Sequence, residues 1–319
     1  MSKNKNIKKS LYILTEGHTE QAYFSRISEI LGDEDEWKYS VTVDVREIVD
    51  GSKTDPVNMV KEAKKSQKSY DEVWVVFDKD RDRDQQNLQA FELAAKSKIK
   101  VAFSSISFEE WVLLHFERSI TAFQRSDCES RGQQCTCNGA ICASTYIRLN
   151  YYPTYVKGKA KLYDDLSDKR DVALEFAAWL KYRHSPLTNY HLLNPFTDVD
   201  NLVSQLFELP AIRYVAINTS FSFEGIDFCV TNHSTVNNVI TVSIQMVNNS
   251  NRSFIFNNAQ QNIKLLGINN VELNYTISHA QIINNLDNRT IDIQFAINGL
   301  FQASKLKFQT NNECVHVEL

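Results

Sequence analysis

The fold is decided by residues 73–80, which read Val73-Trp74-Val75-Val76-Phe77-Asp78-Lys79-Asp80. An apolar run of this length, closed by charged residues, is typical of a parallel strand that is buried on both faces. We therefore predict a central strand from Glu72 to Phe77. Two shorter runs, Ser10 to Thr15 and Ile99 to Ser104, predict further strands, whereas Ser40 to Val49 alternates less cleanly.

Helix-like segments separate these strands. Residues 19–31 place apolar side chains on one helical face, namely Ala22, Phe24, Ile27, Ile30 and Leu31. The pattern continues in residues 56–68, 84–97, 107–117 and 159–208. Because strands that alternate with helices form parallel sheets, we predict a doubly wound α/β domain over residues 1–210.

The amino-acid composition and the hydrophobic pattern of the chain change near Pro210. Residues 211–319 hold 19 asparagines against 9 in the longer part before them. Apolar and polar residues also alternate there with a period of two, as in Val239-Ile240-Thr241-Val242-Ser243-Ile244. Short alternating strands with Asn-rich turns predict a second domain over residues 211–319, an all-β, immunoglobulin-like antiparallel sandwich.

The charge balance excludes one class of function. A net charge of −4 and a pI near 6.0 argue against a sequence-independent nucleic-acid coat protein, which is normally basic. Residues 1–210 hold 29 Lys+Arg and 32 Asp+Glu, while residues 211–319 hold 6 and 7, so phosphate binding is expected in the first domain. No apolar run is long enough to span a bilayer, and no signal peptide is recognisable, so we expect a cytoplasmic protein without membrane contact.

Three carboxylates follow two of the predicted strands. Glu16 comes directly after the first strand, and Asp78 and Asp80 end the third. Residues two apart in an extended chain face the same way, so both aspartates can point at one cation at the sheet edge where α/β proteins place ligands. Magnesium takes oxygen ligands of this kind. The sequence therefore predicts a divalent-cation site at this edge.

The residues around these carboxylates have simpler readings. Gly17 allows a tight turn from strand to helix, and Thr19 is expected to cap that helix. Asp82 and Asp84 fit a solvated loop or the cap of the next helix.

Four segments resemble, in order, the characteristic segments of the RloB-like proteins. They are Thr15-Glu16-Gly17-x-Thr19-Glu20-x-x-Tyr23-Phe24, Val73 to Asp80, Ser105 to Glu117, and Asn194-Pro195-Phe196-Thr197-Asp198-Val199. The Glu after the first strand and the Asp-x-Asp after the third are similar to the Toprim domain of topoisomerases, primases and OLD-type nucleases. The resemblance spans roughly residues 9–208. It departs at Ser105-Ile106-Ser107-Phe108, where the family has an Asn-Pro-type turn, and the C-terminal β domain is not part of the family pattern.

The resemblance implies roles for four residues. It implies that Glu16 is the general acid/base or a metal ligand, and that Asp78 and Asp80 are ligands of magnesium or manganese. Glu109 matches the later acidic position of the family, although an acid at a helix N-terminus is an equally good reading. A metal at this edge would serve phosphodiester hydrolysis.

Other polar residues have both a functional and an ordinary reading. His115 lies in a strongly apolar helix and is read as a core histidine, and His18 is read as either a phosphate contact or an exposed turn residue. Several lysines could bind a nucleic-acid backbone, although solvated helix faces explain most such runs. They are Lys53, Lys61, Lys64, Lys65, Lys68, Lys157, Lys159 and Lys161. Tyr151, Tyr152 and Tyr155 either stack on bases or pack within the protein.

Four cysteines fall in one polar insertion at about residues 123–150. They are Cys128, Cys135, Cys137 and Cys142. A reducing compartment disfavours disulfides, so a structural zinc site is one reading. The spacing lacks paired C-x2-C knuckles, and unliganded or redox-active thiols remain the alternative.

The resemblance implies a magnesium-dependent nuclease in bacterial anti-phage defence, with RNA, tRNA included, preferred over DNA. It also implies an ATPase or other defence protein as a partner, and the β domain would serve recognition or docking. The alternative is a non-catalytic interaction protein whose Toprim fold binds nucleotide or nucleic acid.

Overall fold

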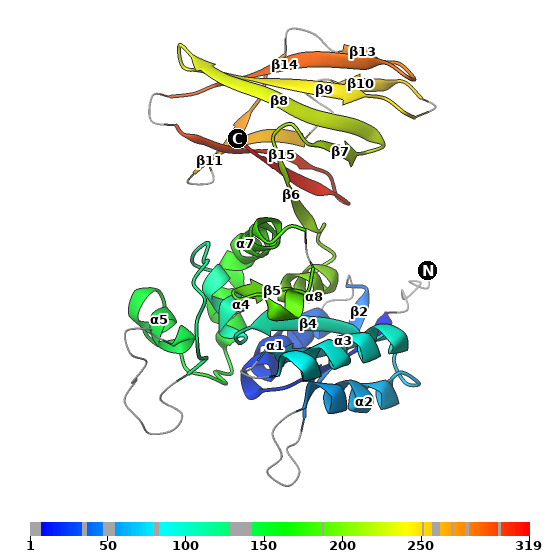
Figure 1. Cartoon of the computed structure of the whole chain (residues 1–319), viewed down its shortest axis with the longest axis vertical. Helices are drawn as coiled ribbons and strands as arrows, with labels where there is room; N and C mark the ends of the chain where they lie inside the picture. The colour runs from blue at the N-terminus through cyan, green and yellow to red at the C-terminus, as the bar shows by residue number, and fades with distance from the viewer. Residues whose placement is uncertain are drawn as a thin grey trace. The chain divides into compact units, whose positions relative to one another are not determined.

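The computed structural model describes residues 8–33, 37–46, 55–79, 83–127, 142–186, 188–250, 252–256, 262–268, 271–277, 281–298 and 301–319. Of the predicted site residues, Asp80, Cys128, Cys135 and Cys137 lie outside these ranges. The chain divides into two compact units, Met1–Glu208 and Leu209–Leu319 (Figure 1).

The first unit is built on a five-stranded sheet in the order β2-β1-β3-β4-β5. Its strands are β1 (Lys9–Thr15), β2 (Tyr39–Val45), β3 (Glu72–Asp78), β4 (Lys100–Ser105) and β5 (Phe196–Thr197). The apolar run of β3 is buried along its length, because β1 and β4 flank it and helices cover its faces. β2 lies at the sheet edge and is only half-buried, which explains its less regular pattern.

The prediction of a parallel sheet holds for β1 to β4, whereas the short strand β5 runs antiparallel to β4. Two polar contacts hold β5 in place. The buried hydroxyls of Ser104 and Thr197 lie 2.9 Å apart. Asp198 accepts a short hydrogen bond from the Phe103 N–H and donates its own N–H to the Phe103 carbonyl. The sheet is therefore mixed.

Eight α-helices lie in the described part of this unit. They are α1 (His18–Asp33), α2 (Pro56–Ser66), α3 (Asp84–Ser97), α4 (Glu109–Leu114), α5 (Ala143–Asn150), α6 (Leu162–Leu166), α7 (Arg170–Arg183) and α8 (Val199–Leu206). Figure 1 shows α2 and α3 below the sheet and α4, α7 and α8 above it. Tyr12, Val75 and Phe103 join α2 and α3 in one apolar core. In the part of the chain described, no helix is long and apolar enough to cross a membrane.

The buried face of α1 differs from the predicted one in two ways. It carries Thr19, Glu20, Tyr23, Phe24, Ile27 and Leu31, whereas Ala22 and Ile30 are only half-buried. Thr19 lies within the first turn, so its expected role as a helix cap was wrong. The buried face of α1 also carries an acid, Glu20, among mainly apolar side chains.

The second unit is all-β, as predicted, with two larger sheets around one apolar core. One sheet has the order β14-β9-β8-β7 and is antiparallel; the other has the order β12-β11-β15-β16-β6, with β6 parallel to β16. Phe221 and Phe308 meet across the core with ring centroids 5.1 Å apart. The strands are β6 (Ile212–Ala216), β7 (Ser220–Phe223), β8 (Ile226–Val236), β9 (Val239–Val247), β10 (Phe254–Phe256), β11 (Asn262–Gly267), β12 (Glu272–Asn274), β13 (Gln281–Ile283), β14 (Asn288–Ala296), β15 (Ala303–Gln309) and β16 (Cys314–Glu318). A two-stranded sheet pairs β10 with β13.

Candidate functional site: a carboxylate pocket

A polar pocket of about 370 Å³ opens at the carboxyl ends of β1 and β3. Its lining comes from the β1–α1 turn, the end of β3, the start of α4 and a segment between α5 and α6. The lining residues are Glu16, Gly17, His18, Thr19, Glu20, Asp78, Phe108, Glu109, Lys157 and Gly158. This is the edge at which α/β sheets place their ligands.

The structure brings the predicted residues Glu16 and Asp78 together. β1 and β3 are adjacent and parallel, and the Glu16 N–H donates to the Val76 carbonyl at 2.9 Å. The Asp78 N–H donates to Glu16 Oε2 at 3.0 Å, and Arg83 lies 3.5 Å from Glu16 Oε1. Asp80, the third predicted carboxylate, lies outside the described residues.

Glu20 is a site residue that sequence reasoning missed. Its side chain is buried and lines the pocket beside Gly17. A methyl group on Gly17 would lie 2.7 Å from Glu20 Oε2, so glycine leaves room for this carboxylate. Burial, with the negative charges of Glu109 and Glu16, raises the pKa of Glu20 to about 7. The available signal was its place on the apolar face of α1.

Four acidic side chains line this pocket, namely Glu16, Glu20, Asp78 and Glu109. Burial raises the pKa of Asp78 well above its ordinary range, and the charges of Glu20, Glu16 and Glu109 raise it further. Lys157 opposes this effect without cancelling it. Because like charges disfavour one another's ionised forms, the pocket favours the arrival of a cation or a proton.

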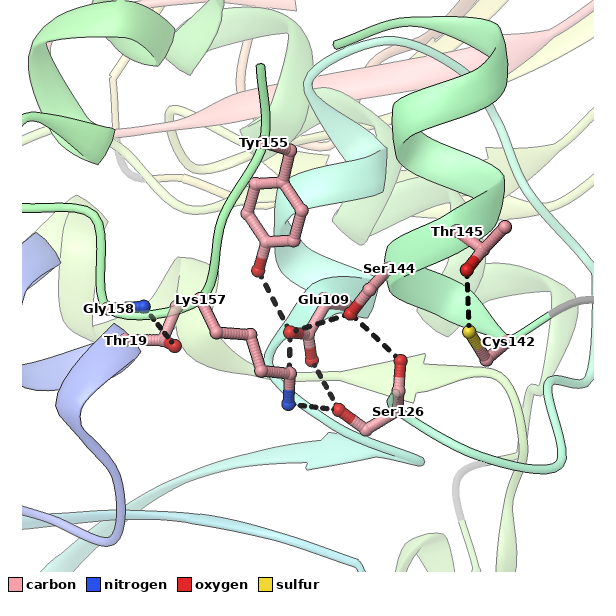
Figure 2. A network of polar contacts seen from close by, with 9 residues as sticks. All are labelled: Thr19, Glu109, Ser126, Cys142, Ser144, Thr145, Tyr155, Lys157 and Gly158. Atoms are coloured by element: carbon pink, nitrogen blue, oxygen red, sulfur yellow. Dashed lines mark hydrogen bonds and ion pairs between the residues drawn. The ribbon is translucent and has the colours of Figure 1, made fainter. Parts of the chain in front are cut away.

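Glu109 is held differently from the other carboxylates (Figure 2). Its buried side chain accepts hydrogen bonds at Oε1 from Tyr155 at 2.8 Å and Ser144 at 3.3 Å, and at Oε2 from Ser126 at 2.9 Å. The ammonium of Lys157 lies 3.1 Å from Oε1. Burial alone would raise the pKa of Glu109, but the charge of Lys157 and hydrogen bonding by Ser107, Tyr155 and Lys157 outweigh it and lower the pKa.

Lys157 belongs to a short segment, residues 155–158, that we call the strap. Tyr155 and Lys157 both contact Glu109, and the Gly158 N–H donates to Thr19 Oγ1 at 3.0 Å (Figure 2). Burial alone would lower the pKa of Lys157, but the charges of Glu109 and Asp78 raise it above its ordinary value. Lys157 therefore carries a positive charge among the carboxylates.

Of the other residues weighed from the sequence, His115 is a core residue. It is buried, its Nδ1 lies 2.9 Å from the Trp111 carbonyl, and burial lowers its pKa to about 4. His18 is exposed at the pocket rim, with Nδ1 3.2 Å from Gln21 Oε1. Lys159 pairs with Asp165 at 2.8 Å, away from the pocket lining.

Cys142 alone of the four clustered cysteines lies within the described residues. It is buried, and its thiol donates to Thr145 Oγ1 at 3.0 Å at the start of α5 (Figure 2). The zinc site stays a prediction.

The donor set suits a hard divalent cation. Glu16 and Asp78 offer carboxylate oxygens at two strand ends, and magnesium is commonly held by one or two carboxylates together with water and phosphate. Within the described ranges, no three Asp, Glu, His or Cys side chains converge to form a complete protein-only metal cage. Glu16 and Asp78 therefore match the oxygen ligands that magnesium takes in proteins.

Comparison with known proteins places the first unit in a family. No curated protein matches the chain. Among solved structures, the yjhA protein from Bacillus subtilis is similar at a TM-score of 0.27 and 12% identity, covering 33% of this chain and 98% of that one. The family model of the RloB-like proteins matches residues 11–206, which is more than half of the chain. The residues that line the pocket all fall in the matched range, and the chain belongs to the RloB-like family.

Proposed function

We propose that this protein is a metal-dependent nuclease that hydrolyses phosphodiester bonds of nucleic acid. The observation that carries the proposal is the pairing of Glu16 and Asp78 at the ends of adjacent strands, inside a pocket crowded with negative charge. Acidic side chains that raise one another's pKa in this way gain from a cation or a proton that offsets their charge. A site built this way is typical of enzymes that act on phosphate esters.

The chain's own residues divide the chemistry among them. Glu16 and Asp78 would hold magnesium or manganese, which when bound stabilises charge on a phosphate and lowers the pKa of water. Glu20, with its pKa raised to about 7, is the carboxyl best matched to accept and return a proton at neutral pH. We also propose that the first unit is related to the Toprim domain and that Asp80 is a further ligand of the metal.

The test is direct. Purified protein is incubated with tRNA, single-stranded RNA and plasmid DNA, in magnesium, manganese or EDTA. We expect cleavage that requires the divalent ion, is stronger on RNA than on DNA, and is lost in Asp78→Asn. Cleavage that persists equally in EDTA or in this variant would show that the activity comes from elsewhere.

The second unit is proposed to act as a recognition or docking module. Residues 211–319 carry few charges, and apolar and polar residues alternate along β7, β9 and β14, leaving polar side chains on the outer face. Such a surface binds phosphate poorly and suits contact with a protein. A role in anti-phage defence, with an ATPase or another defence protein as partner, is part of this proposal.

A second candidate is a module that binds nucleotide or nucleic acid without cleaving it. It is favoured by the incomplete metal cage among the described residues. The same assay separates the two, because a binding module would retain oligonucleotide without producing fragments in either magnesium or manganese.

A further inference from the structure

Glu109 is the best-satisfied carboxylate of the pocket. The hydroxyls of Tyr155 and Ser126 and the ammonium of Lys157 contact its two oxygens, the Ser144 hydroxyl is shared between Glu109 and the Ser126 carbonyl, and the Glu109 side chain is 1% exposed. A carboxylate in this state has little capacity left for a metal, because each further ligand would have to displace a donor that already compensates its burial.

Lys157 is the group that Glu109 holds. Its side chain is 38% exposed, and its ammonium lies 3.1 Å from Glu109 Oε1 and donates to Ser126 Oγ. Lys157 also lines the pocket and interacts electrostatically with Asp78 and Glu20. Glu16 and Asp78 line the same pocket.

The strap fixes this position from both sides. Tyr155 anchors it to Glu109, and Gly158 anchors it to Thr19 in the first turn of α1. Gly158 has φ +70°, a conformation that other L residues rarely adopt. Because α1 begins two residues after Glu16, this contact sets the distance between Lys157 and the predicted cation site.

We propose that Glu109 is a positioning residue and that Lys157 is the phosphate-binding cation of this site, placed to contact a non-bridging oxygen of a nucleic-acid phosphate. The inference rests on the proposed nuclease function and adds a role to it. A fixed ammonium beside a cation site supplies a second positive charge where phosphate charge must be neutralised. Glu109, with Ser126, Ser144 and Tyr155, keeps that ammonium in place.

The first experiment separates positioning from metal binding. Manganese binding to the full-length protein is measured by titration for Lys157→Met, Glu109→Gln and Asp78→Asn. We expect Asp78→Asn to weaken manganese binding at least tenfold, and the other two variants to bind it as tightly as the parent protein. A tenfold loss in Glu109→Gln would make Glu109 a metal ligand and overturn the positioning role.

The second experiment reports on the contact itself. Lysine acylation followed by peptide mass spectrometry measures the reactivity of each amine. Glu109→Gln should release Lys157 and raise its acylation rate severalfold, while Lys96, an exposed lysine on α3, reacts unchanged. Equal reactivity of Lys157 in both proteins would contradict the anchoring.

The third experiment tests phosphate binding with a fluorescent single-stranded RNA oligonucleotide in calcium. Lys157→Met should bind it at least tenfold more weakly, with a salt dependence smaller by about one ion, and Lys157→Arg should recover most of the loss. The matched control Lys96→Met should bind like the parent. Unchanged binding in Lys157→Met overturns the phosphate assignment.

Cleavage separates this inference from the function on which it rests. If the parent cleaves, Lys157→Met should lower the turnover rate by about 10²- to 10³-fold without raising the manganese concentration that cleavage requires. When Glu109→Gln is combined with Lys157→Met, the rate should fall little further. If the parent binds the oligonucleotide through Lys157 yet never cleaves, the nuclease proposal fails and the phosphate site stands.

Discussion

The backbone N–H of Asp78 donates a hydrogen bond to the carboxylate of Glu16, 62 residues earlier in the chain. The Glu16 carboxylate therefore accepts a hydrogen bond from the backbone at the end of β3, the strand that carries Asp78. This bond keeps the two residues close although both are acids.

Neutralising the aspartate should separate activity from stability. Asp78→Asn is expected to abolish metal-dependent cleavage and to raise the melting temperature of the metal-free protein by a few degrees, because it removes a half-buried carboxyl whose ionised form its neighbours disfavour. Asp80→Asn should also abolish cleavage. The matched control Asp84→Asn, at the exposed start of α3, should remain active. Cleavage and thermal unfolding measure the two effects, and full activity in Asp78→Asn would refute the site.

Glu20 should give the metal-free protein a pH-dependent stability. Its folded-state pKa of about 7 lies above its ordinary value of 4.5, so its contribution to the free energy of unfolding is complete below pH 4.5 and is lost as the pH rises through 7. The loss is on the order of 3 kcal/mol at most. The difference between the parent and Glu20→Gln in urea titrations from pH 4 to pH 8 isolates this contribution. A difference that does not change with pH would show that Glu20 titrates normally.

Saturating manganese should flatten the same pH profile. A cation beside Glu20 favours the ionised carboxylate, so the folded-state pKa should fall towards its ordinary value. A profile that is the same with and without manganese would place the cation away from Glu20.

A side chain at position 17 should displace the Glu20 carboxylate. In Gly17→Ala the new methyl group would lie 2.7 Å from Glu20 Oε2, so the Glu20 carboxylate must move. Because only the end of the Glu20 side chain must move, we expect a stability loss of about 1 kcal/mol, together with a large loss of cleavage. Gly32→Ala, within α1 and with open space around the new methyl, should instead be stabilised by up to about 1 kcal/mol. If both variants behave alike in denaturant unfolding, the close approach to Glu20 has no effect.

Ending the chain after Glu208 should leave a folded, metal-dependent catalytic core. The first compact unit ends at this residue, and all the residues that line the pocket precede it. Cooperative unfolding and the cleavage assay check the result. In cells, the shortened protein should lose targeting or regulation, and a folded core that cannot bind nucleic acid would assign the β unit to the substrate site instead.

The cysteine cluster should bind about one zinc ion per chain. Metal analysis of protein purified without chelator should detect the zinc, and replacing Cys135 and Cys137 by Ser should remove it. A zinc-free protein whose four clustered thiols all titrate would leave the cluster without a structural metal.

The sequence predicts the strand ends well because the apolar runs before Glu16 and Asp78 have only one stable place, the buried centre of a sheet. Glu20 could have been found too, since it lies four residues before Phe24 on the buried face of α1. The environment of Glu109 could not. Its partners Ser126, Ser144, Tyr155 and Lys157 lie 17 to 48 residues further along the chain, and only the folded backbone brings them together.

The hydrogen bond between Gly158 and Thr19 joins residues that are 139 positions apart. During synthesis, Glu16, Asp78 and Glu109 leave the ribosome well before the strap does. Contacts between such distant residues form late, because the chain between them must first be ordered. A nascent chain that has reached α4 therefore holds the carboxylates without Lys157. For the proposed nuclease, this order of assembly would keep the unfinished chain inactive beside the ribosomal RNA and tRNA that surround it.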